Sequence, residues 1–383
     1  MTYRPIWRMT ALPLSAMGMM LASPALAHKA GDPIPNSYIC TFVPGPSTGS
    51  YEAHAAVAKV GGQITHLYSH VINGFAARLN ERAVQTLMAR NPHINYCEQD
   101  SFVTVPDSED TAMAAIGRPG GGGGTTQTTP WGVTRVGGTR SGAGKRVWVV
   151  DSGVGPHSDL NIDANLSRSF LSTDPLGNPA SFNDYLGHGT HVSGTIAAIN
   201  NSIGVVGVAA GATVISVRVL DATGSGPDSG VLAGLDYIAT NAPAAGEVIN
   251  ISLIADSNIF DSAVINLGNS GINVVIAAGN NGAPAINYSP GKVDAPNVYT
   301  VSAFDNRDRL ASFSNYGNPP IDFSEPGVNI SSLDKNNGYS TKSGTSMAAP
   351  HLSGILLVAG HANSGGAIKA DKDATPDTIG VLP

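Results

Sequence analysis

Runs of apolar residues divide the chain into two segments with different patterns. Before residue 106, the apolar runs are short, some alternate with polar residues, and they are separated by two stretches of helical spacing. The predicted elements are strands at 38–43, 63–68, 74–79 and 94–105, and helices at 53–60 and 81–90. This order is the split ferredoxin-like pattern, in which the first and last strands are neighbours. Residues 33–106 are therefore expected to form a small α+β domain.

Beyond Pro130 the apolar runs become continuous and rich in β-branched residues, and helical stretches of small residues separate them. The predicted strands are at 146–150, 213–219, 248–253, 273–277 and 298–302. Continuous apolar strands that alternate with helices indicate a parallel sheet covered on both faces. Residues 130–362 are thus predicted to be an α/β domain with a doubly wound parallel sheet. We expect residues 107–129 to be a linker and residues 363–383 a short polar tail.

Composition narrows the class of protein. The chain has 383 residues, of which 42% are hydrophobic and only 13% are charged, about half the usual charged share. Basic residues number 21 and acidic residues 28, so a nucleic-acid partner is not favoured. The sequence contains no uninterrupted run of 18 apolar residues, so no membrane-spanning helix is expected.

Residues 1–27 have the pattern of an export signal. Arg4 and Arg8 precede an apolar run at 11–21, and Ala25-Leu26-Ala27 is a small-x-small cleavage site. A disordered amino terminus is the alternative. The mature chain is therefore expected to be secreted or periplasmic, where disulfides are permitted.

The chain contains two cysteines, Cys40 and Cys97. They fall on the first and last strands of the predicted small domain, which should be neighbours. A bridge between them would close a loop of 57 residues, worth about 4 kcal/mol in the chain-entropy model. Two free buried thiols remain the alternative.

Four polar residues stand at strand ends or helix starts beyond Pro130. Asp151 ends a buried strand, His188 lies between two glycines at a helix start, and Ser346 begins another helix. Asn280 follows the strand at 273–277 and carries two amide donors. Ligands of doubly wound folds bind at the carboxyl ends of the strands. Taken singly, each residue has a plain explanation as a cap, a turn residue or, for His188, half of a zinc site with His191.

Together these segments resemble a known family. Asp151-Ser152-Gly153, His188-Gly189-Thr190-His191 and the segment 344–351 (GTSMAAPH) resemble the three active-site motifs of subtilisin-like serine proteases, the subtilases. Ala278-Gly279-Asn280 is similar to the family's oxyanion segment. The resemblance runs from about residue 130 to residue 360. Residues 38–105 resemble the family's inhibitory propeptide, most clearly at 74–79.

This resemblance implies a serine endopeptidase that hydrolyses polypeptide substrates through an acyl-enzyme, with Asp151, His188 and Ser346 as the triad and Asn280 as an oxyanion donor. It also implies a self-processing, monomeric zymogen. Its propeptide is expected to be both an intramolecular inhibitor and a folding helper. The last propeptide strand, near 101–105, would enter the cleft, and cutting would fall between residues 106 and 126.

The resemblance further implies a cleft in which substrate adds as a strand. One edge is the segment Gly224-Ser225-Gly226, and the other comprises Ser252, Leu253, Ile254 and Ala255, with Ala278 and Gly279 nearby. Family members usually have glycines where Ile254 and Ala255 stand. Their side chains should narrow the cleft, so we expect a preference for small residues before the scissile bond.

A structural Ca²⁺ site is implied as well, because residues 199–205 resemble the family's calcium loop. The matching ligands are the side chains of Gln127, Asp159 and Asn201 and the carbonyls of Ile199, Ile203 and Val205. Six oxygens suit this hard cation. Since Gln127 lies in the linker, the site is expected to be complete only after maturation. An ordinary Asn-Gly turn is the alternative.

Two rival functions remain. A non-catalytic binding protein on the same scaffold would have lost triad residues, all of which are present here. A serine-carboxyl peptidase would replace the histidine with acids, which the segment 187–191 argues against.

Overall fold

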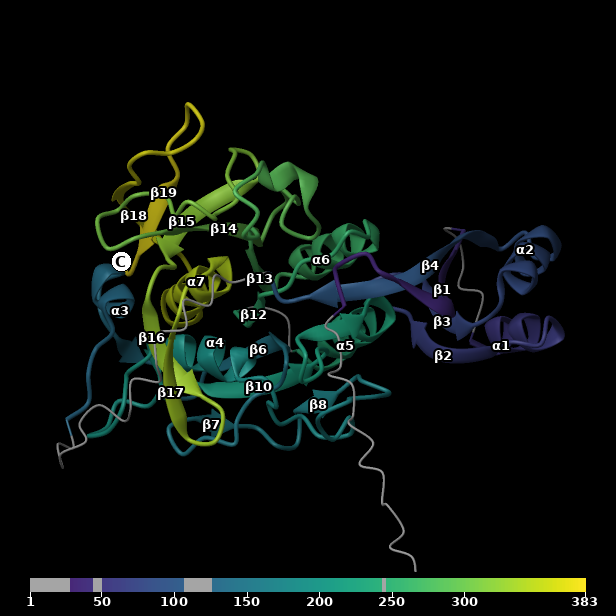
Figure 1. Ribbon diagram of the computed structural model, residues 1–383, viewed down its shortest axis with the longest axis horizontal. Helices are drawn as coiled ribbons and strands as arrows, with labels where there is room; N and C mark the ends of the chain where they lie inside the picture. The colour runs from purple at the N-terminus through teal and green to yellow at the C-terminus, as the bar shows by residue number, and fades with distance from the viewer. Residues whose placement is uncertain (1–27, 44–49, 107–125, 243–245) are drawn as a thin grey trace, which may run out of the picture.

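The computed structural model describes residues 28–43, 50–106, 126–242 and 246–383. The predicted export signal and most of the predicted linker lie outside these ranges. A small amino-terminal unit stands at one end of a larger unit built around a long sheet (Figure 1). Within the described ranges, no helix has both the length and the apolar character needed to cross a membrane.

The amino-terminal unit has the predicted ferredoxin-like order. It contains β1 (Pro33–Phe42), α1 (Ser50–Lys59), β2 (Gln63–Tyr68), β3 (Gly74–Arg78), α2 (Glu81–Arg90) and β4 (Ile94–Thr104). Its strands lie in the order β4-β1-β3-β2, so the first and last are neighbours. Local rules set the start of α2, because the Asn80 side chain accepts a hydrogen bond from the Ala83 N–H at 2.9 Å.

The larger unit is a doubly wound α/β domain, as predicted. Its main sheet contains, from edge to edge, β7 (Asn161–Ile162), β10 (Thr213–Arg218), β6 (Arg146–Asp151), β12 (Val248–Ile251), β13 (Asn273–Ala277), β14 (Val298–Phe304), β15 (Ile321–Pro326), β19 (Thr378–Val381) and β18 (Asn363–Ala367), with β8 (Arg168–Ser169) also paired to β10. Pairing is parallel from β7 to β19, and only β18 runs antiparallel to its neighbour.

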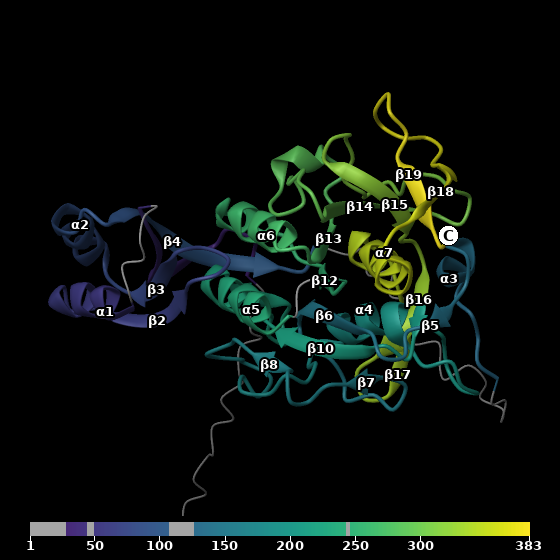
Figure 2. The ribbon, with the colours of Figure 1, turned by 180° about the vertical axis from the view of Figure 1, so that it is seen from behind.

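Helices cover both faces of this sheet (Figures 1 and 2). They are α3 (Trp131–Arg135), α4 (His188–Ala197), α5 (Asp228–Asn241), α6 (Ile259–Asn269), α7 (Thr345–Ala359) and a short 3-10 helix, η1 (Ala285–Asn287). The remaining strands are β5 (Arg140–Ser141) with β9 (Ala209–Ala210), the hairpin β16 (Ile330–Asp334) with β17 (Gly338–Lys342), and β11 (Ser225–Pro227).

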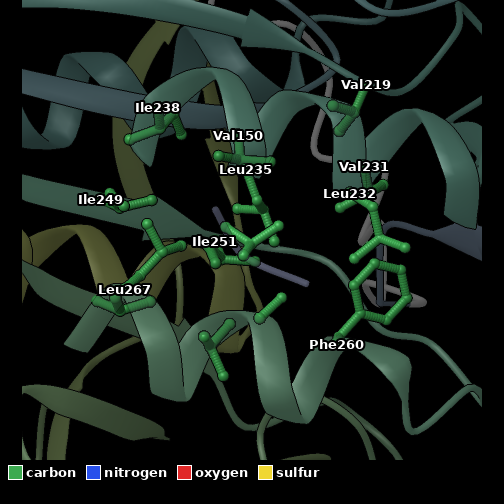
Figure 3. Packing of buried hydrophobic residues seen from close by; sticks show 14 of the residues in the cluster. Val150, Val219, Val231, Leu232, Leu235, Ile238, Ile249, Ile251, Phe260 and Leu267 are labelled. Carbon is green, nitrogen blue, oxygen red and sulfur yellow. The ribbon is translucent and has the colours of Figure 1, made fainter. Parts of the chain in front are cut away.

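Alternate residues of each strand supply the two core layers. Trp148 and Val150 of β6 belong to the layer under α5 and α6, which Figure 3 shows around Leu235, Ile251 and Phe260. Val147 and Val149 belong to the opposite layer, under α4 and α7. Because side chains alternate along a strand, a continuous apolar run is what two covered faces require.

The carboxyl-terminal residues differ from the prediction. Residues 363–383, expected as a polar tail, form β18 and β19, and β19 adds to the main sheet with Ile379 opposite Ser324. Ile379 and Ile368 are buried against Phe304. The prediction failed because these few apolar residues are dispersed among Gly, Asp and Lys residues and show no strand period.

A disulfide ties the amino-terminal sheet together. Cys40 of β1 and Cys97 of β4 lie directly opposite in the antiparallel register and are covalently joined. Of the two alternatives that the sequence left open, the bridge is the one found. The bond therefore links β4, the last strand of the amino-terminal unit, to β1, the strand beside it in the sheet.

Replacing both cysteines by alanine should lower the free energy of unfolding of the amino-terminal unit by about 4 kcal/mol, because the unfolded chain regains the freedom of a 57-residue loop. We expect an earlier first melting transition in calorimetry of the uncut chain. Dithiothreitol should shift the wild-type transition in the same direction and leave the double variant unchanged. Equal melting curves for the two chains would contradict a stabilising role.

Candidate active site

The polar residues singled out from the sequence gather at one edge of the main sheet. Asp151 is the last residue of β6, and Asn280 follows the end of β13 by three residues. His188 is the first residue of α4, and Ser346 is the second residue of α7. These two helices pack against each other on the same face of the main sheet. Two contacts link these four segments in pairs: Asp151 to His188, and Asn280 to Thr345, the residue before Ser346. The packing of α4 on α7 places the starts of both helices on the same face of the sheet.

Asp151 and His188 form a buried hydrogen-bonded pair. Nδ1 of His188 lies 2.8 Å from Oδ1 and 3.0 Å from Oδ2 of Asp151, which is completely buried. A carboxylate at this position holds a proton on Nδ1 and leaves Nε2 as the basic nitrogen. A Cβ on Gly189 would come within 2.1 Å of the Gly153 carbonyl, so only glycine lets α4 approach this closely.

Asp184, which the sequence analysis did not select, organises this pair. Its carboxylate accepts hydrogen bonds from Ser152 Oγ, from the Gly187 N–H and from both the N–H and Oγ1 of Thr190. It therefore joins the loop after β6 to the first turn of α4. An Asp three residues before a glycine at a helix start is a capping signal that could have revealed it.

Ser346 stands in the first turn of α7 and is 2% exposed. Its Oγ has no hydrogen-bond partner within the described residues. Two side chains at the end of β12 hold the backbone of this serine. Ser252 Oγ donates to the Ser346 carbonyl at 3.4 Å, and Asn250 Nδ2 donates to Ser252 Oγ at 2.9 Å. A hydroxyl at a helix amino terminus lies beside free N–H groups that favour a developing anion.

Thr345 orients Asn280. The Asn280 Oδ1 accepts hydrogen bonds from the N–H and from Oγ1 of Thr345, each at 2.9 Å. Oγ1 in turn accepts the Gly279 N–H at 3.1 Å. With Oδ1 held in this way, the Nδ2 group faces the loop before Ser346, since it lies 3.1 Å from where a Cβ on Gly344 would stand. Thr345 was not predicted, although a hydroxyl just before a helix-starting serine is a visible signal.

The predicted peptide groove is occupied by the chain itself. β4 runs antiparallel to β11, with Ser225 opposite Thr104 and Gly226 opposite Val103. On its other edge, Thr104 exchanges hydrogen bonds with Ile254 in both directions, at 2.9 and 3.2 Å. The Val105 N–H donates to the Gly224 carbonyl at 3.1 Å. The expectation that residues 101–105 enter the cleft is therefore confirmed.

The Ile254 side chain extends toward the segment after β13, on the same side of the groove as Ile254 itself. Its Cδ1 lies 3.3 Å from the place of a Cβ on Gly279, which belongs to the segment after β13. The backbone of Ala255 is turned away from β4, since its N–H donates to the Ser289 carbonyl at 3.0 Å. Leu253 and Ala278 are buried beneath the groove. The side chain of Ile254 thus takes up the space between the segment after β12 and the segment after β13.

Oxygens of the predicted calcium loop converge on Gln127. Its Nε2 donates to the carbonyls of Ile199, Ile203 and Val205 at 2.7, 3.2 and 3.0 Å. Gln127 already reaches the loop in the uncut chain, contrary to the expectation that maturation brings it there. Nearby, Asp159 Oδ1 accepts from Asn201 Nδ2, and Oδ2 is buried with no partner in the described part of the chain. Burial raises the pKa of Asp159 to about 6.

The other histidines near the site have different partners. His191 Nε2 contacts the Ile330 carbonyl at 3.0 Å, and His351 Nδ1 contacts the Met347 carbonyl at 3.0 Å. Burial lowers the pKa of His191 well below its usual value and that of His351 to about 4, which favours the neutral form of both rings. Among the described residues, no group of three or more His, Cys, Asp or Glu side chains is arranged to hold a metal.

Comparison with known proteins agrees with this architecture. The model of the subtilase family matches residues 142–379, and the model of the I9 peptidase inhibitors matches residues 46–106. Proteinase R of Parengyodontium album is 34% identical over 365 residues, which cover 90% of this chain and 85% of that protein.

A thermostable alkaline protease of Halalkalibacterium halodurans is 42% identical over 241 residues, which cover 61% of this chain and 63% of that protein. The structure of a cold-adapted subtilisin-like serine proteinase matches with a TM-score of 0.55 and 34% identity, covering 66% of this chain and 97% of that one. With an inhibitor domain followed by a matching catalytic domain, this chain belongs to the subtilase family.

Proposed function

We propose that this chain is an exported serine endopeptidase, made as a zymogen that processes itself and then acts as a monomer. The proposal is supported by the buried Asp151–His188 pair, together with the buried, unpartnered hydroxyl of Ser346 at the start of α7, the helix that packs against α4. The groove beside them accepts an extended peptide as an added strand. Export rests on the pattern of residues 1–27.

In the proposed mechanism, His188 Nε2 removes the proton of Ser346 Oγ as that oxygen attacks the carbonyl carbon of the scissile bond. The resulting oxyanion is bound by Asn280 Nδ2 and the Ser346 N–H. The imidazolium is stabilised by Asp151 and then gives its proton to the leaving amine, so that the C–N bond breaks and an acyl-enzyme remains. Water, activated by His188, hydrolyses the ester and restores Ser346.

The rival proposal, a binding protein without catalysis, would leave the serine inert. A fluorophosphonate probe separates the two, because it labels only a serine whose hydroxyl is activated by a base. Covalent labelling of Ser346 in the mature chain, found by peptide mapping, would support the hydrolase. A mature, folded chain that stays unlabelled would favour the binding protein.

Replacing Ser346 by alanine should make the uncut chain accumulate, because no nucleophile remains to cut the segment after β4. Activity on added peptides should fall by about 10⁶-fold, a magnitude known from subtilisin itself. Immunoblots of whole culture, with time, would follow the precursor. The matched control is Ser270→Ala, an exposed serine that ends α6, which should mature normally. Normal cutting of Ser346→Ala would mean that another protease does the processing.

We further propose that the enzyme prefers small residues before the scissile bond, because the Ile254 side chain takes up space between its own segment and Gly279, beside the groove. Ile254→Gly should raise kcat/KM for peptides with Phe at this position by roughly tenfold, with little change for Ala peptides. Ile254→Val is the conservative control, with an intermediate profile. Wild-type enzyme that cleaves the Phe peptides as fast as the Ala peptides would disprove the preference.

A structural Ca²⁺ ion is proposed for the loop at 199–205. The carbonyls that converge on Gln127 and the buried, unpartnered Asp159 Oδ2 fit a hard cation. Binding would turn the amides of Gln127 and Asn201, whose nitrogens now face these oxygens, so that their oxygens become ligands. The ion would cross-link the loop to the segment that contains Gln127 and so stabilise the folded state.

Chelation should therefore lower the melting temperature of the mature form. At a hundredfold excess of calcium over its Kd, the bound ion contributes about 2.7 kcal/mol, so EDTA should cost roughly 5–10 °C. Asp159→Asn should melt earlier and lose the response to EDTA. Calorimetry that finds the same melting temperature with and without chelator would show that no such ion binds.

A further inference from the structure

The uncut chain provides a view of how a long peptide lies in the groove, because β4 occupies it as a bound strand between α5 and α6 (Figures 1 and 2). Pairing with β11 ends at Pro227, which lies opposite Phe102. The next residue back along β4 is Ser101. It has passed the end of β11 and meets the first residue of α5, Asp228.

Ser101 and Asp228 are joined by a short hydrogen bond. Ser101 Oγ donates to Asp228 Oδ2 at 2.5 Å, and Asp228 is 1% exposed. The other oxygen, Oδ1, is buried and has no hydrogen-bond partner in the described ranges. In a complex with a substrate, both carboxylate oxygens of Asp228 could therefore accept hydrogen bonds from the substrate side chain that replaces Ser101.

The present environment of Asp228 is created by the propeptide strand. Burial under β4, with the carboxylates of Asp100 and Glu98 nearby, raises the pKa of Asp228 to about 8. Both of those acids belong to β4 and leave with it. Asp100 itself accepts the Ser229 N–H at 3.1 Å and Ser229 Oγ at 2.6 Å, so it caps α5 while it is bound.

When β4 leaves the groove, the strand that covers Asp228 is removed, so its carboxylate should regain contact with water. It then stands in the first turn of a 14-residue helix, whose free N–H groups favour an anion. The groove would keep this negative charge at the end where β11 stops. A substrate longer than the β11 pairing must place a side chain against it.

We propose that Asp228 determines specificity in this groove by selecting substrates with a hydrogen-bond donor or a cation, and against an acid, at the position that Ser101 occupies in β4. That position is three residues before the one that pairs with Ile254. The inference rests on the proposed function. It extends substrate recognition beyond the residues that make backbone hydrogen bonds with β11 and Ile254.

A hydroxyl repeats the contact of Ser101, and the flexible stem of lysine lets its ammonium reach either carboxylate oxygen. An aspartate in the same place meets a like charge. Since the site is at the rim of the groove once the propeptide has left, the charge effect is modest, on the order of a two- to fivefold change in affinity.

The test uses dye-labelled, acetylated hexapeptides with the sequence of residues 101–106 and the changes Ser101→Lys, Ser101→Ala and Ser101→Asp. Their Kd values on the mature wild-type enzyme, measured by fluorescence anisotropy, should increase in the order Lys, Ala, Asp, with about a fivefold span. Raising the salt from 0.05 to 0.5 M should reduce the span. In Asp228→Asn enzyme the Lys and Asp peptides should bind nearly equally.

The matched control is Asp236→Asn, the same change on the same helix. Asp236 accepts backbone N–H groups of Ser69, His70 and Val71, away from β4, so its loss should leave the peptide order unchanged. Equal Kd values for the Lys and Asp peptides on wild-type enzyme would overturn the inference, even if Asp228→Asn fails to mature.

Fluorophosphonate labelling of the same samples distinguishes a failure of the Asp228 inference from a failure of the proposed function. A labelled, mature enzyme with no discrimination among the peptides would overturn the role of Asp228 alone. A chain that neither matures nor labels would overturn the proposed function, and the inference with it.

Discussion

The hydrogen bond between Asp151 and His188 is the interaction on which the rest of the site depends. A carboxylate with no exposure to water is stable only with a partner, and the imidazole is that partner. To bring them together, β6 must end where α4 begins, and a glycine must let the helix approach the strand. Asp184 then holds the loop after β6 and the first turn of α4 in one network. The geometry of the Asp151–His188 pair is therefore a consequence of how two distant segments are packed.

A second constraint is the shape of the groove that β4 occupies, which we propose a substrate also uses. Backbone hydrogen bonds to Gly224, Ser225 and Ile254 hold β4 without regard to most of its side chains. Such pairing accepts many sequences, so discrimination must come from the few side chains that enter the groove or border it. The two side chains that we propose for this role are Ile254, whose Cδ1 lies near Gly279, and Asp228, which lies where β11 ends.

The amino-terminal unit explains why one strand can serve as inhibitor. β4 is held in its own sheet by β1 and by the Cys40–Cys97 bond, and its far end continues into the groove. The strand is thus presented in an extended form before it meets the larger unit. This lowers the conformational entropy that binding would otherwise remove.

The sequence by itself identified the parts that local patterns encode. Apolar runs predicted the central strands, alternating runs the small domain, and short motifs the residues Asp151, His188, Asn280 and Ser346. Each of these signals is contained within a few consecutive residues, so no knowledge of distant contacts was needed.

The tertiary structure decided whatever depends on pairing between distant segments. The register of β1 and β4 chose the disulfide over free thiols, and the main sheet turned the dispersed apolar residues around Ile379 into an added strand. Thr345 and Asp228 became candidates only through their contacts with Asn280 and Ser101. A hydroxyl or carboxylate has the same sequence signal whether it caps a helix or faces a ligand, and only its neighbours in space distinguish the two.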